Sequence, residues 1–85
     1  MHPTDDDMAK AAASNLANKL KAEFPELQIE VTPHDFGDKL KLEVRDPATG
    51  GTLFLEGQLL LYGMAEDGRA ALARARIKAW LKEEH

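Results

Sequence analysis

The 85-residue sequence predicts an α+β fold in which two helices cover one face of an antiparallel sheet. Segments with apolar residues at helical spacing stand near both ends of the chain, over residues 4–24 and 64–84. Between them, apolar and polar residues alternate in short stretches separated by turn-forming residues, the pattern of half-buried strands. The order helix, three or four antiparallel strands, helix predicts a two-layer sandwich. We expect one domain over residues 1–85, with a disordered N-terminus at residues 1–4.

The first helix is predicted by one apolar stripe. Its members recur every three or four residues and are Ala9, Ala13, Leu16, Leu20 and Phe24, with Ala17 beside them. Thr4 is placed to cap the start of the helix, and the acidic residues 5–7 suit the positive end of the helix dipole. Pro25 ends the helix because proline disfavours the helical conformation in the residue before it.

Two strands and the turn after them are predicted by alternation. Apolar residues occupy the odd positions of Leu27–Thr32 and the even positions of Lys39–Arg45, so each segment reads as a half-buried strand. Residues 33–38 are expected to form a turn or short loop. Residues 46–51 read Asp-Pro-Ala-Thr-Gly-Gly, a strong turn signal, so we expect a hairpin into a strand that starts at Thr52.

The segment from Thr52 to Gly63 is apolar on both faces of any strand. Three arrangements fit it: one long strand bulged at Gly57, two short strands that turn at Glu56-Gly57, or a helical turn over residues 58–62. We favour strand character throughout. A bulge at Gly57 is expected to reverse which side chains face the core beyond it.

The excess of apolar residues in this segment predicts a surface for protein contact. Helices on one face of a sheet leave the other face bare, and a large exposed apolar patch usually marks an interface. We therefore expect a partner protein, or a second copy in a homodimer, to cover the candidate interface residues Phe54, Leu59, Leu60, Leu61 and Tyr62. The alternative is that the leucines fill a small core completely.

The second helix combines an apolar arc with a cluster of cations. The arc contains Ala70, Ala73, Ile77, Trp80 and Leu81, and Gly68 places the helix start near Glu66 or Asp67. The basic residues of this helix are Arg69, Arg74, Arg76, Lys78 and Lys82. They form a candidate face for an anion or nucleic acid, and the competing interpretation is a solvated helix face. Arg76 stands one turn before Trp80, at a spacing that permits a cation–π contact.

The order helix, three antiparallel strands, helix in under 90 residues resembles that of the double-stranded RNA-binding domain. The resemblance spans the chain but is one of topology only, and no membership is assigned. That family carries a basic cluster at the start of its second helix to span phosphates. Here the corresponding residues 64–69 read Met-Ala-Glu-Asp-Gly-Arg, in which two acids accompany the single cation Arg69.

The net charge and the residues able to act in catalysis or metal binding limit the functions that the sequence allows. The formal net charge is −4 and the pI is about 5.3, which argues against wholesale binding to nucleic acid. There is no cysteine, the single serine is Ser14 on the predicted polar face of the first helix, and His2, His34 and His85 form no recognisable ligand pattern. The glycines match no phosphate-binding motif. We expect no catalytic residues, no metal and no cofactor; acid–base catalysis by His34 or Asp35 is a distant alternative.

The predicted function is that of a small acidic, non-catalytic protein which acts by contact with another protein. The alternative is RNA or DNA binding through the basic second helix. No signal segment is visible, and the longest apolar run, residues 59–62, is far shorter than the roughly 20 residues that a membrane-spanning helix needs. We expect a cytoplasmic location, no membrane partner and no small-molecule substrate.

Overall fold

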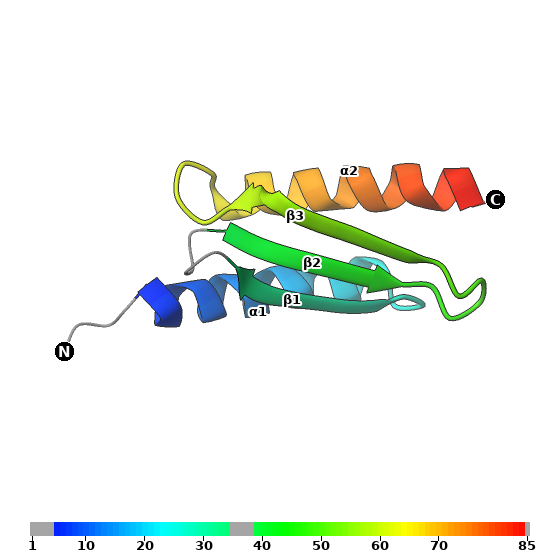
Figure 1. Cartoon of the computed structure of the whole chain (residues 1–85), viewed down its shortest axis with the longest axis horizontal. Helices are drawn as coiled ribbons and strands as arrows, with labels where there is room; N and C mark the ends of the chain where they lie inside the picture. Colours follow the sequence, from blue (N-terminus) through cyan, green and yellow to red (C-terminus); the bar gives the residue numbers. More distant parts are fainter. Residues whose placement is uncertain (1–4, 35–38, 85) are drawn as a thin grey trace.

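A computed structural model of the chain describes residues 5–34 and 39–84. Its elements are α1 (Asp5–Glu23), β1 (Gln28–His34), β2 (Lys39–Arg45), β3 (Thr52–Leu60) and α2 (Glu66–Glu84). The strands form an antiparallel meander in the order β1-β2-β3, and both helices lie on one face of this sheet and run in the same direction (Figure 1). The predicted α+β fold is confirmed, with three strands. The predictions of disorder at residues 1–4 and of a cap at Thr4 lie outside the described residues.

Helix α1 forms as its apolar stripe predicts. Five side chains of the stripe, together with Ala12, are buried against the sheet: Ala9, Ala12, Ala13, Leu16, Ala17 and Leu20. The alanines among them have small side chains, which let the helix backbone approach β1 and β2 closely. The last helical hydrogen bond joins the amide of Phe24 to the carbonyl of Leu20 at 2.8 Å, and Pro25 then ends the helix.

Strand β1 extends two residues beyond the predicted end at Thr32. Its core side is set by the pairs Ile29↔Val44 and Val31↔Leu42, and the pairing continues through Pro33 to His34. Proline lacks an amide hydrogen, whereas in a central strand each amide donates to one of the two neighbouring strands. Because β1 is an edge strand with one neighbour, the sheet accommodates Pro33, and the segment predicted as loop is partly strand.

Strand β3 is one strand with a bulge at Gly57, as the first of the three predicted arrangements has it. Leu42 pairs with Leu55, whereas Leu40 pairs with Leu59. Between these two pairs, β3 therefore contains two more residues than β2. Gly57 has a φ of 81°, which favours glycine. The expected reversal of facing is wrong, because an insertion of two residues returns the strand to the same parity and buries both Leu55 and Leu59.

The core lies between the helices and the sheet. Its completely buried large side chains come from all elements except β1: Leu16, Leu20, Leu40, Leu42, Val44, Leu55, Leu59 and Ile77. Leu53, Leu61 and Leu72 pack against this cluster and are partly buried. Most of the leucine run therefore fills the core. On the other face, the sheet positions are largely polar or charged, for example Glu30, Lys41 and Glu43.

Candidate functional site

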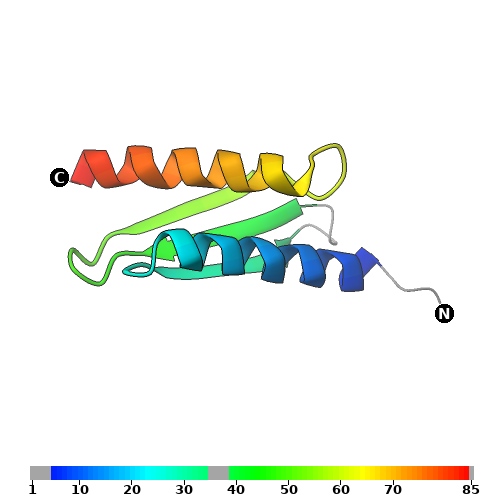
Figure 2. The same ribbon diagram turned by 180° about the vertical axis from the view of Figure 1, so that it is seen from behind.

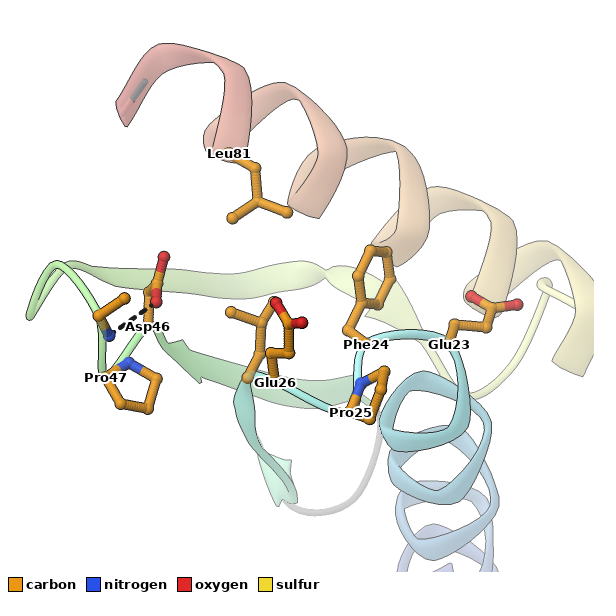
Figure 3. A pocket seen from close by; sticks show the side chains of 9 residues that line it. Glu23, Phe24, Pro25, Glu26, Asp46, Pro47 and Leu81 are labelled. Carbon is orange, nitrogen blue, oxygen red and sulfur yellow. Dashed lines mark hydrogen bonds between the residues drawn. The ribbon is translucent and has the colours of Figure 1, made fainter.

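A groove opens at one end of the molecule, where two connections between elements meet the last turn of α2 (Figure 3). It has a volume of about 730 Å³. Its lining comes from the end of α1 and the link to β1, from the β2–β3 turn and from the last turn of α2: Glu23, Phe24, Pro25, Glu26, Leu27, Asp46, Pro47, Ala48 and Leu81. Six of these nine residues are apolar, and none is a lysine, arginine or histidine.

The groove exists because α1 stops before α2 does. Figure 2 shows the two helices side by side, with α2 continuing toward the end of the sheet past the point where α1 has ended. Pro25 sets that point, and the amide of Leu27 then donates to the carbonyl of Phe24 at 3.1 Å as the chain turns into β1. Phe24 and Leu81 point toward the space between α2 and the sheet (Figure 3). Both are partly buried against the core, so the floor of the groove is an extension of the core.

The wall formed by the β2–β3 turn is held by its own hydrogen bonds. The amide of Asp46 donates to the carbonyl of Gly51 at 3.0 Å, and the amide of Gly50 donates to the carbonyl of Asp46 at 2.7 Å. The carboxylate of Asp46 accepts a hydrogen bond from the amide of Ala48 at 3.0 Å, the local pattern that aspartate favours before a turn. This side chain is a buried carboxylate at the edge of the groove.

The charges on the groove are acidic, and one of them is neutralised within the fold. Glu23 accepts hydrogen bonds from the Nε and Nη2 atoms of Arg74 at 2.7 and 2.5 Å. These bonds hold the pKa of Glu23 below its usual value, opposed by partial burial and assisted by the positive charges of Arg74, Lys78 and Lys19. Glu26 is exposed and forms no ion pair with the described residues.

The residues predicted as a protein interface divide into buried and exposed members. Leu59 is 0% exposed and offers no surface, and Leu60 and Leu61 are partly buried. Phe54 is 53% exposed and Tyr62 47% exposed. Phe54 lies on the largely polar face of the sheet, where the ammonium group of Lys41 is 5.8 Å from the centre of its ring.

The basic residues of α2 divide into two that are held by contacts within the fold and three that are exposed. Arg69 is 7% exposed, and its Nη1 atom donates to the carbonyls of Leu60, Leu61 and Met64 at 3.1, 3.1 and 2.7 Å. It therefore ties the loop after β3 to the first turn of α2. Arg74 is engaged by Glu23. The other three, Arg76, Lys78 and Lys82, are exposed.

Three further predictions concern a cation–π contact, metal ligands and acid–base catalysis. The cation–π contact between Arg76 and Trp80 does not form, and the contact between Lys41 and Phe54 is the one present within residues 5–34 and 39–84. No group of three or more potential metal ligands gathers among these residues. The distant alternative of catalysis by His34 or Asp35 concerns side chains outside the described part.

The groove was not predicted from the sequence, because its walls come from segments about 20 and 30 residues apart along the chain. Two local signals pointed to its parts: Pro25 as a helix stop, and the Asp46-Pro47 turn. No signal in a single sequence brings those parts together with Leu81, since that depends on how far α2 runs past α1.

No protein-family model, curated protein or solved structure matches this chain. The resemblance to the double-stranded RNA-binding domain thus remains one of element order. No helix among the described residues has the length and apolar character required to cross a membrane.

Proposed function

We propose that this chain is a non-catalytic binding module that acts by contact with another protein. The observation that carries the proposal is the groove between the end of α1, the β2–β3 turn and Leu81. Its apolar floor is continuous with the core, and the wall formed by the β2–β3 turn is held by backbone hydrogen bonds. A groove of this kind accepts an apolar side chain from a partner without rearrangement, which lowers the entropic cost of binding.

The open position of the groove favours a polypeptide over a small molecule. Small-molecule sites bury most of the surface of their ligand. This groove lies at the end of the molecule and is open to solvent, so a ligand in it keeps one side exposed (Figure 3). An extended or helical segment of a partner can place one side chain in the groove and cover the rim with its backbone.

The nucleic-acid alternative is supported by fewer side chains than the sequence indicated. Arg69 and Arg74 are both held by contacts within the fold, as described above. At the first turn of α2, where a phosphate-binding cluster is expected by the resemblance, Asp67 and Glu66 instead pair with Lys19 at 3.1 and 3.7 Å. We therefore do not put forward nucleic-acid binding as the function.

The proposal is tested by selecting binders from a library of random 12-residue peptides displayed on phage, with the full chain as bait. The groove is then blocked by Ala48→Lys, a change at an exposed lining residue whose backbone makes the turn contacts. The matched control is Ala75→Lys on the exposed side of α2. Circular dichroism establishes that both variants keep the fold.

We expect selected peptides to bind the parent chain and the Ala75→Lys variant equally, and to lose binding to the Ala48→Lys variant. Failure to select any peptide contradicts the proposal. So does a set of peptides that bind the Ala48→Lys variant as well as the parent. Binding lost instead in a variant of Phe54 would place the contact on the other face of the sheet.

A further inference from the structure

We infer that the partner presents an apolar side chain next to a lysine or arginine. This inference rests on the proposed function of the groove and specifies its ligand. The groove has an apolar floor formed by Phe24, Leu27 and Leu81, and three of its nine lining residues are carboxylates. A segment with an apolar anchor and a neighbouring cation matches both features.

The distribution of charge within the groove decides which carboxylates are available. Glu23 is satisfied by Arg74 through two hydrogen bonds and is not expected to attract a further cation strongly. Asp46 uses one carboxylate oxygen to accept from the amide of Ala48. Glu26 is exposed, and its carboxylate lies beside the same space as Phe24 (Figure 3). Glu26 is therefore the main contact for the cation of the partner.

The lining of the groove contains no positively charged residue. No lysine, arginine or histidine is among the lining residues, so no described side chain of the groove itself repels an incoming cation. An acidic ligand would meet Glu26 and Asp46 without a compensating positive group on the lining. Anionic ligands, including nucleic-acid phosphates, are thus disfavoured at this site by like charge.

Two measurements on peptides from the selection test the inference. The first is their sequence: we expect a leucine, isoleucine, methionine or aromatic residue followed or preceded closely by lysine or arginine. The second is a double-mutant cycle in which the cation of the best peptide is replaced by norleucine and Glu26 by glutamine. Each change alone is expected to weaken binding by up to about fivefold, the effect of an exposed ion pair, and the second change should add little once the first is present.

The matched control is Glu30→Gln, at an exposed glutamate on the opposite face of the sheet, which should leave binding unchanged. The weakening caused by Glu26→Gln should also shrink as the salt concentration rises. Peptides that need the groove but lack a cation, or effects of the two changes that simply add, overturn this inference and leave the proposed function standing. Peptides that do not need the groove overturn both.

Discussion

The carboxylate of Glu23, at the last residue of α1, receives two hydrogen bonds from the guanidinium group of Arg74 in α2. Both Nε and Nη2 donate, so the pair has the planar two-point geometry that arginine forms with carboxylates. The contact joins the two helices beside the groove, 51 positions apart along the chain. It fixes the end of α1 relative to α2 and thereby helps to set the width of the groove.

Replacing Glu23 by glutamine should make the free energy of unfolding depend less on pH in the acid range. Arg74 holds the pKa of Glu23 below its usual value, so the unfolded chain takes up a proton there before the folded chain does. The stabilisation by Glu23 is therefore present at neutral pH and is lost as the pH falls through the pKa of the folded state. Urea unfolding between pH 7 and pH 3 gives the free energy of unfolding of the parent and of the Glu23→Gln variant at each pH. The difference between the two should shrink toward pH 3. A difference that grows toward low pH would contradict this assignment.

Replacing Arg69 by methionine should destabilise the fold by about 2–4 kcal/mol. The change keeps a long apolar stem but leaves the carbonyls of Leu60, Leu61 and Met64 without their donor in a partly buried place. The control is Arg76→Met, the same change at an exposed position of α2, which should stay within about 0.5 kcal/mol. The two variants are compared by their midpoints of urea unfolding, provided that the dependence of the unfolding free energy on urea has the same slope in both. Equal effects would show that Arg69 is no structural anchor.

Leu59 and Phe54, both predicted as interface residues, should behave differently on truncation. Leu59→Ala opens a cavity in the core and should cost about 2–5 kcal/mol of unfolding free energy. Phe54 is 53% exposed, so Phe54→Ala should cost less than about 1 kcal/mol. Thermal unfolding of the two variants at the same protein concentration makes the comparison. A larger loss for Phe54 would mean that its ring is buried in solution, as in a dimer.

Two glycine-to-alanine changes should move stability in opposite directions. Gly57 has a φ of 81° at the bulge, so alanine there should destabilise by about 1–2 kcal/mol although no atom lies in its way. Gly68 lies in α2 without such a φ, and an added methyl group would meet the side chain of Met64 at an ordinary 3.6 Å. Alanine at Gly68 should stabilise by about 0.4–1 kcal/mol. Equilibrium urea unfolding measures both; loss at both sites would contradict the account of the bulge.

Much of the fold could be predicted from the sequence because its elements obey local rules. The stripe of α1, the stop at Pro25 and the alternation of β2 each depend on residues close together in the chain. The end of β1 was missed because tolerance of Pro33 depends on β1 being an edge strand, which is a property of the sheet. The facing of Leu59 was misjudged because the number of extra residues in a bulge is set by pairing with Leu40.

The candidate sites were harder to predict for a related reason. A cluster of cations on α2 reads as a binding face until Glu23 and the loop carbonyls are seen to occupy Arg74 and Arg69. A run of leucines reads as surface until the helices that cover it are placed. The groove depends on where α1 ends relative to α2, so only the assembled structure shows it.

The most direct test of the central claim is a nuclear magnetic resonance titration of the ¹⁵N-labelled chain with the best peptide from the selection. Amide shifts are expected to change around the groove, at Phe24, Leu27, Ala48 and Leu81. The amides of Phe54 and Glu30 on the other face of the sheet should stay unchanged. Shift changes confined to that other face, or to the exposed cations of α2, would contradict the assignment of the groove as the protein-binding site.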